Sequence, residues 1–152
     1  MELPNGLKES AFRSMLKQGF IFRLRGDKPF ESDVYHVFVV LNYDFDNGEV
    51  LLLVNGTSRV EKRIEYLNKV GIDVDATTVV FEAGSYSFIT KRTIFDCNSV
   101  KSININDIPF GNEIRFIGDQ LSSDDIEKLI RAALASENVL ESHKKIINPK
   151  QD

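Results

Sequence analysis

Apolar and polar residues alternate in short runs through the middle of the chain, and this pattern predicts a sheet-rich fold. Residues 20–25 (FIFRLR) alternate with the two-residue period of a strand. Residues 34–43 and 50–54 are dense in Val, Phe and Leu, as in strands that are buried on both faces or line the core of a barrel. Later β-branched and aromatic runs predict short strands at 77–82, 87–89, 93–95, 100–105 and 114–117.

The segment between the two densest apolar runs predicts a β-hairpin. Its turn, DFDNGE, contains an Asn-Gly pair, which favours the left-handed backbone of a tight turn. Counting seven residues outward from Tyr43 and from Val50 pairs His36 with Thr57. The hairpin should therefore bring His36 close to the hydroxyl pair Thr57-Ser58 at its open end.

Helical periodicity is found at both ends of the chain. Residues 7–18 predict a short helix, because their apolar side chains share one side and Gly19 is a natural C-terminal stop. Residues 122–125 (SSDD) can cap and open a second helix, which should end near Ser136 or extend to Leu140. Its apolar stripe comprises Ile126, Leu129, Ile130, Ala133 and Leu134.

These elements together predict a mainly β fold, a small, strongly bent sheet or β-barrel with an N-terminal and a C-terminal helix. The length suits a single domain over residues 1–152, with a helix in 1–18, the barrel core in 19–118 and a helix in 122–140. Residues 59–70 are either a short helix or an excursion from the sheet. The final segment, ESHKKIINPKQD, predicts a frayed tail.

Composition limits the class of protein. The net charge of −4 gives no general attraction to nucleic acid, although positive residues cluster locally at 23–28, 59–63 and 91–92. Cys97 is the single cysteine, which excludes an internal disulfide or cysteine-based zinc site and favours a reducing cytoplasm. The longest apolar runs are far short of a membrane span, and the first residues lack the features of a signal peptide. Cys97 itself is expected to be a small buried core residue.

The sequence contains none of the common phosphate-loop, dinucleotide or paired-histidine metal motifs, so candidate chemistry must come from isolated polar groups. Metal-free RNA cleavage needs a base for the 2′-hydroxyl proton, an acid for the leaving oxygen and cations for the developing charge. Histidine, hydroxyl and Lys or Arg side chains can fill these roles. Each group also has an ordinary explanation as a solvated strand end, a turn cap or an exposed cation. The polar groups that interrupt the β-rich region are His36, Thr57-Ser58 and the run TKRT, which holds Lys91 and Arg92.

The order of segments resembles a known family. HVFVVLN, GEVLLLVNGTS, TTVVFEAG, SFITKRTIFDCNSVKSI and DDIEKLIRAAL follow one another as in the PemK/MazF-like toxins of bacterial toxin–antitoxin systems and the related ToxN/AbiQ-type endoribonucleases. The resemblance covers roughly residues 19–135. It implies an SH3-like barrel that cleaves single-stranded RNA without a metal or other cofactor. It also implies a cognate antitoxin protein as partner, a homodimer, and no membrane association.

The resemblance carries over to particular residues. Thr57 and Ser58 match the family's hydroxyl pair, and Tyr35-His36 stands at or beside its Arg-Pro. Lys91 lies in the region before the Cys-bearing strand. The implied catalytic residues are thus His36, Thr57, Ser58 and Lys91, and the implied RNA-binding residues are Arg25, Arg59 and Arg92. The missing arginine and the acidic net charge favour the alternative, a non-catalytic SH3-like module that binds a protein or a nucleic acid.

Overall fold

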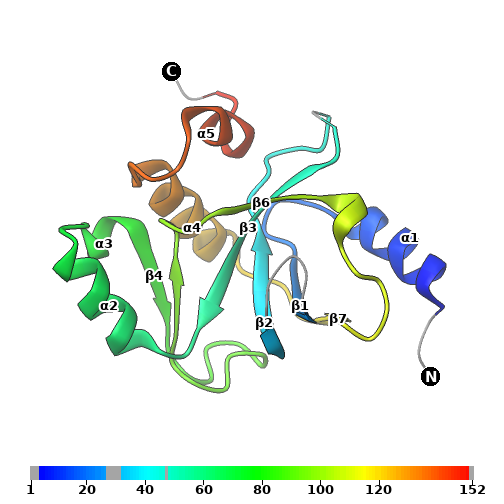
Figure 1. The fold of residues 1–152 in the computed structure, drawn as a ribbon, viewed down its shortest axis with the longest axis horizontal. Coiled ribbons are helices and arrows are strands. Elements are labelled where there is room, and N and C mark those ends of the chain that lie inside the picture. Colours follow the sequence, from blue (N-terminus) through cyan, green and yellow to red (C-terminus); the bar gives the residue numbers. More distant parts are fainter. Residues whose placement is uncertain (1–3, 27–31, 47, 151–152) are drawn as a thin grey trace.

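The computed structural model of the chain describes residues 4–26, 32–46 and 48–150, which form a sheet flanked by helices (Figure 1). The strands are β1 (Ile21–Gly26), β2 (Ser32–Val40), β3 (Val50–Thr57), β4 (Thr78–Phe81), β5 (Thr93–Asp96), β6 (Lys101–Asn104) and β7 (Ile114–Phe116). The helices are α1 (Asn5–Met15), α2 (Val60–Lys69), α3 (Val74–Thr77), η1 (Ile105–Asp107), α4 (Ser123–Ala135) and α5 (Glu141–Ile147).

The sheet is antiparallel and open. Its strand order is β4-β5-β3-β2-β1-β7, with β6 also paired to β3. Within the described residues β4 and β7 do not pair with each other, so the predicted closed barrel is wrong. Helices hold more of the chain than strands do, about 35% against 26%, so the fold is mixed α and β rather than mainly β.

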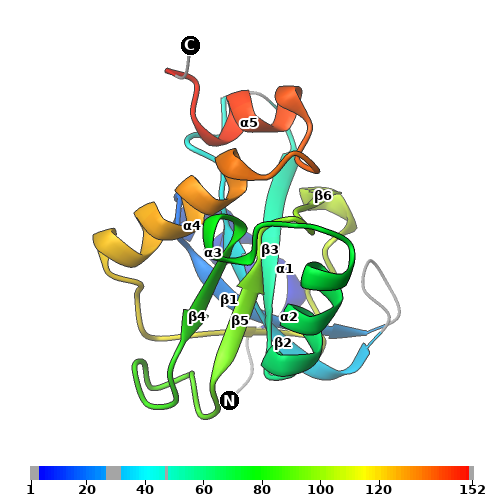
Figure 2. The same ribbon diagram turned by 90° about the vertical axis from the view of Figure 1, so that its left-hand side faces the viewer.

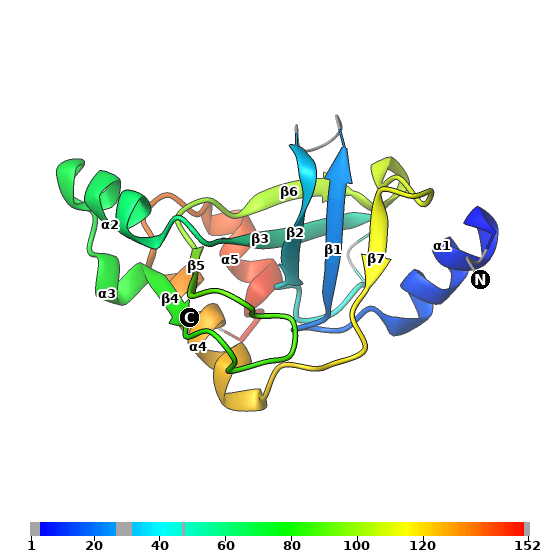
Figure 3. The same cartoon turned by 90° about the horizontal axis from the view of Figure 1, so that it is seen from below.

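Strand β3 is the centre of the sheet and changes partners along its length. Leu53 pairs with Val40 of β2 on one edge and with Lys101 of β6 on the other. Beyond Asn55 the partner is β5, through Gly56 and its neighbour. The sheet twists strongly here, and Figure 3 shows β3 and β6 running across the direction of β1, β2 and β7.

Both faces of the sheet are buried, as the unbroken apolar runs of β2 and β3 indicate. On β3, Leu51 and Leu53 face one core while Leu52 and Val54 face the other. The first core lies under α4 and α5, and its members include Ile21, Val39, Leu52, Val54, Phe95, Cys97, Leu129 and Ala133. The second core lies under α1 and is rich in Phe, with Phe12, Phe20, Phe22, Phe38, Leu51, Leu53, Ile103 and Ile114.

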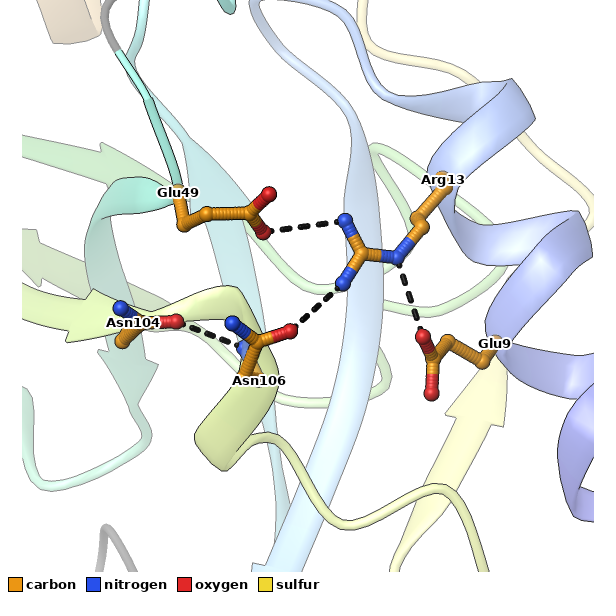
Figure 4. A network of polar contacts seen from close by, with 5 residues as sticks. All are labelled: Glu9, Arg13, Glu49, Asn104 and Asn106. Carbon is orange, nitrogen blue, oxygen red and sulfur yellow. Dashed lines mark hydrogen bonds and ion pairs between the residues drawn. The ribbon is translucent and has the colours of Figure 1, made fainter.

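Helix α1 is fixed to the sheet by one ring and one cation. Phe12 is fully buried and makes edge-to-face contacts with Phe20 and Phe22 at centroid distances of 5.6 and 5.1 Å. Arg13 donates to Glu9 of its own helix (3.1 Å), to Glu49 before β3 (3.0 Å) and to the side chain of Asn106 in η1 (2.8 Å), as Figure 4 shows. These contacts with Glu49 and Glu9 raise the pKa of Arg13.

The β2–β3 hairpin is confirmed, but its connection is longer than predicted. The ladder pairs Phe38 with Asn55 and Val40 with Leu53, which is the register that the sequence count gives. Past Val40 the Leu41 N–H still donates to the Leu52 carbonyl (2.9 Å). The side chain of Asn42 adds two bonds to β3: its Nδ2 donates to the Val50 carbonyl (2.9 Å) and its Oδ1 accepts the Leu52 N–H (2.8 Å). The predicted Asn-Gly turn falls partly on residue 47, outside the described residues.

Several predicted elements need revision in the second half of the chain. Residues 59–70 are helix α2, which resolves the choice between helix and excursion. The predicted strand at 77–82 forms β4, preceded by the short helix α3, whereas 87–89 forms turns instead of a strand. The C-terminal helix ends at Ala135 and does not continue to 140.

The predicted frayed tail is a docked helix, α5. Ile147 is buried against the first core, and the Tyr43 N–H of the β2–β3 connection donates to the Ile146 carbonyl (3.0 Å). Gln18 stabilises the same corner, because its Nε2 donates to the carbonyls of Leu41 (2.8 Å) and Ile147 (3.0 Å). Figure 2 shows α5 beside α4. Helix α5 is therefore packed against the first core rather than frayed.

Candidate functional site

The hydroxyl pair lies where β3 ends and α2 begins. Thr57 is the last residue of β3, and its Oγ1 accepts the N–H of Arg59 (3.2 Å) in a local turn. Ser58 and Arg59 follow and are exposed. Thr57 pairs with Ile94 of β5, so the strand register fixes the position of this turn.

Gly56 explains why β3 can approach β5 so closely at this point. A Cβ atom placed there would lie 2.7 Å from Cγ2 of Thr93 and 2.8 Å from Cζ of Phe95. Such distances are below van der Waals contact, so only glycine fits without a shift of its neighbours. The glycine therefore helps to set where the following hydroxyl groups lie.

The second group of predicted residues precedes β5 and meets the same end of β3. Arg92 lines an open depression of about 430 Å³ together with Ser58, Arg59 and Lys62. Lys91 is exposed next to it, and its carbonyl accepts the hydroxyl of Thr93 (2.8 Å). The structure thus brings together the residues at 57–59 and those at 91–92, which are more than thirty positions apart in sequence.

The cation of this depression is held by two acids. Arg92 donates to Glu61 of α2 (2.7 Å) and to Glu82 after β4 (3.0 Å). All three side chains are largely exposed, so solvent and salt screen these ion pairs and each contributes little to stability. A ligand phosphate could therefore displace them at small cost.

The first turn of α2, from Val60 to Lys62, lines the same depression and includes the acid Glu61. The residue before the helix, Arg59, makes no side-chain hydrogen bond to cap it. The first N–H groups of a helix have no partner within the helix, and they favour anions. Hydroxyl groups, helix N–H groups and cations at one place form a set that can hold a phosphate.

His36 lies on β2, where its Cα partner is Leu24 of β1. The β2–β3 ladder ends at Phe38 and Asn55, two pairs before His36 would face Thr57, because β3 turns to β5 there. The two residues therefore each pair with a different strand. The proximity of His36 and Thr57 therefore stays a prediction. The register of the β2–β3 hairpin is the register on which that prediction was based.

Arg25 lies in a different part of the sheet from the hydroxyl pair. Its guanidinium carbon lies 4.6 Å from the centroid of the Tyr35 ring, and that of Arg115 on β7 lies 4.4 Å from the same centroid. The Tyr35 hydroxyl donates to the carbonyl of Asn112. The contribution of Tyr35 and Arg115 was not predicted, since only the pairing of β1 with β7 brings residue 115 to this place.

Cys97 is a buried core residue, as predicted. It is fully buried beneath α4, where its thiol donates to the Leu129 carbonyl (3.6 Å). Burial, and to a smaller extent the charge of Asp96, raise the pKa of Cys97 to about 12. A thiol that stays protonated is a poor nucleophile, so this group takes no part in the candidate site.

The described residues group no three His, Cys, Asp or Glu side chains closely enough to hold a metal ion. In the same part of the chain, no helix is long and apolar enough to cross a membrane. No protein-family model matches the sequence, and no curated protein matches it closely enough to count as a relative. The resemblance to PemK/MazF-like toxins therefore remains a hypothesis based on segment order and motifs.

Proposed function

We propose that this protein is a metal-independent endoribonuclease that cleaves single-stranded RNA. The observation that carries the proposal is the meeting of Thr57-Ser58-Arg59 with Lys91-Arg92 where β3 joins β5. Hydroxyl groups, cations and the N-terminus of α2 at one depression suit a phosphodiester that gains negative charge in the transition state.

The reaction uses the 2′-hydroxyl of the RNA as nucleophile. A base removes its proton, the oxygen attacks the adjacent phosphorus, and the bond to the 5′-oxygen breaks as that oxygen receives a proton. His36 is the proposed acid or base, because imidazole can exchange a proton near neutral pH. Thr57 and Ser58 would hold the phosphate oxygens, and Lys91 would stabilise the charge of the phosphorane.

The resemblance to PemK/MazF-like toxins supports the biological setting of the proposal. In that setting the enzyme belongs to a bacterial toxin–antitoxin or phage-defence system, acts in the cytoplasm and is inhibited by a cognate antitoxin. A homodimer is part of the same hypothesis. Arg25, Arg59 and Arg92 would bind RNA phosphates.

The proposal is tested by incubating the purified protein with labelled single-stranded RNA in EDTA. We expect a 2′,3′-cyclic phosphate product, and a rate that falls by about 10² in Ser58→Ala and His36→Ala. Ser142→Ala, an exposed serine of α5, is the matched control and should cleave at the wild-type rate. Thr57→Ser keeps the hydroxyl and should retain more activity than Thr57→Ala. No cleavage by the wild type, or equal cleavage by Ser58→Ala and the control, would overturn the proposal.

A second candidate is a non-catalytic module that binds a protein or nucleic acid. The ion pairs of Arg92 favour it, because an arginine held by Glu61 and Glu82 is less available to a transition state. The same RNA assay decides between the two candidates. Stable binding of RNA without any cleaved product would support the binding module.

A further inference from the structure

Three arginines and one tyrosine gather on one face of the sheet, away from the hydroxyl pair. Arg23 of β1 pairs directly with Arg115 of β7, and Arg25 lies two residues further along β1. Because side chains alternate between faces along a strand, Arg23, Arg25 and Arg115 share one face, the one on which Ile21 joins the first core. These three arginines and Tyr35 are called the arginine face below.

The arginine face is accessible from solvent. Arg115 is exposed, and Arg23, Arg25 and Tyr35 are half-buried. Helix α4, which covers the first core, lies near β4 and away from β7 in Figure 3. This end of the sheet is therefore not covered by the helical layer.

The positive side chains of the arginine face stand next to one another, because Arg23 and Arg115 are direct Cα partners. Among the side chains that the structure describes, which do not include those of residues 27–33, no carboxylate lies within 4.0 Å of the guanidinium groups of Arg23, Arg25 or Arg115. Glu113 is the nearest acid in sequence to Arg115; its carboxylate lies against Gly111, and its stem lies against Gly26, the neighbour of Arg25. Three neighbouring like charges repel one another, so an anionic ligand bound between them would be favourable.

Tyr35 organises this charge. The guanidinium carbons of Arg25 and Arg115 lie 4.6 and 4.4 Å from its ring centroid, which is the range of a cation–π contact. Its hydroxyl is bound to the carbonyl of Asn112, so the ring is held at both ends. Two arginine side chains that are already ordered lose less entropy when they bind a ligand.

We propose that the arginine face binds the phosphodiester backbone of a single-stranded nucleic acid. Arginine matches phosphate oxygens with two parallel hydrogen bonds, and all three cations of the face are arginine rather than lysine. Guanidinium planes also provide surfaces on which unpaired bases stack, an interaction that an acidic peptide cannot make. The inference rests on the proposed function in one respect: the bound nucleic acid would be the RNA that is cleaved at the hydroxyl pair.

Binding is tested with a fluorescent single-stranded DNA oligonucleotide, which lacks the 2′-hydroxyl that cleavage requires. We expect Arg115→Ala to weaken binding about tenfold at low salt. The slope of log affinity against log salt should fall by about 0.7, the value for one lost phosphate contact on a single strand. Arg115→Lys should lie between the wild type and the alanine variant.

Arg131→Ala is the matched control, because it removes one positive charge from α4, where the arginine pairs with Glu127. It should leave the affinity and the salt slope unchanged, and thermal unfolding verifies that both variants fold. Equal affinities for Arg115→Ala and Arg131→Ala would overturn the proposal. So would Arg115-dependent binding of poly-L-glutamate without binding of the oligonucleotide. A protein that binds DNA through this face but does not cleave RNA contradicts only the proposed function.

Discussion

The two basic regions of this molecule differ in the contacts that their arginines make. At the junction of β3 and β5, Arg92 is held by Glu61 and Glu82 beside the hydroxyl pair. On the arginine face, Arg25 and Arg115 contact the aromatic ring of Tyr35. The comparison teaches that similar residue types can serve different purposes. A group of arginines attracts a polyanion over a distance, whereas an ion-paired arginine beside hydroxyl groups is suited to act once a phosphate has arrived.

The largest expected effect comes from removing the arginine face as a whole. The triple variant Arg23→Ala, Arg25→Ala, Arg115→Ala should bind single-stranded DNA about 10²- to 10³-fold more weakly at low salt. Its salt slope should fall by about 2, since each lost contact accounts for about 0.7. Fluorescence anisotropy at several salt concentrations measures both quantities. A slope equal to that of the wild type would remove the distinction between the two regions.

Gly56→Ala should affect the hydroxyl region and spare the arginine face. The added methyl group would meet Thr93 and Phe95, and overpacking of this kind costs about 1–3 kcal/mol of unfolding free energy. Urea denaturation measures the loss, and Gly118→Ala is the control because a Cβ there meets no atom within 4 Å. RNA cleavage should fall in the Gly56 variant while DNA affinity stays unchanged. Equal stability of the two variants would show that β5 can move away from β3.

The buried thiol gives a pH-dependent test of the region beneath α4. Folding raises the pKa of Cys97 from an ordinary value of 9.0 to about 12. Between these values the unfolded chain loses the thiol proton and the folded chain keeps it. The thiol therefore stabilises the fold fully below pH 9, and this contribution declines by about 1.4 kcal/mol per pH unit as the pH rises toward 12.

The measurement compares wild type with Cys97→Ala by urea denaturation at pH 7, 9 and 10.5. We expect the advantage of the wild type to shrink only above pH 9, and the folded protein to resist thiol reagents at neutral pH. An advantage that stays constant to pH 10.5, or rapid labelling at pH 7, would mean that Cys97 is accessible. The hydroxyl pair would then no longer be the preferred reactive group beside β5.

The smallest expected effect comes from releasing Arg92. The double variant Glu61→Gln, Glu82→Gln should bind a non-cleavable 2′-O-methyl RNA about threefold more tightly, because exposed ion pairs are each worth no more than about 1 kcal/mol. Glu127→Gln, Glu141→Gln changes the net charge equally but acts on α4 and α5. A gain of the same size in this control would assign the effect to net charge rather than to Arg92.

The central hairpin could be predicted because its information is local. Two apolar runs and the residues between them gave the register that pairs Phe38 with Asn55. The same reasoning could not predict where the β2–β3 ladder ends. From Gly56 onward β3 pairs with β5, a strand that is distant in sequence. The position of His36 relative to Thr57 depends on that change of partner. The prediction of a closed barrel also rested on local patterns alone, and the open sheet corrects it.

The arginine face and α5 could not be predicted for a related reason. Arg115 meets Tyr35 through β7, a three-residue strand whose partner no local pattern indicates. The tail looked polar, but Ile146 and Ile147 were a signal of a docked helix, and both lie at the first core. Long-range pairing, which neither composition nor periodicity specifies, therefore decided both outcomes.

Single-turnover cleavage of RNA by Lys91→Ala and Arg115→Ala tests most directly whether the two regions divide chemistry from binding. We expect Lys91→Ala to lower the maximal rate about a hundredfold with little change in the RNA concentration needed for half-maximal rate. Arg115→Ala should raise that concentration about tenfold and leave the maximal rate unchanged. A maximal rate that falls equally in both variants, or in neither, would contradict the account.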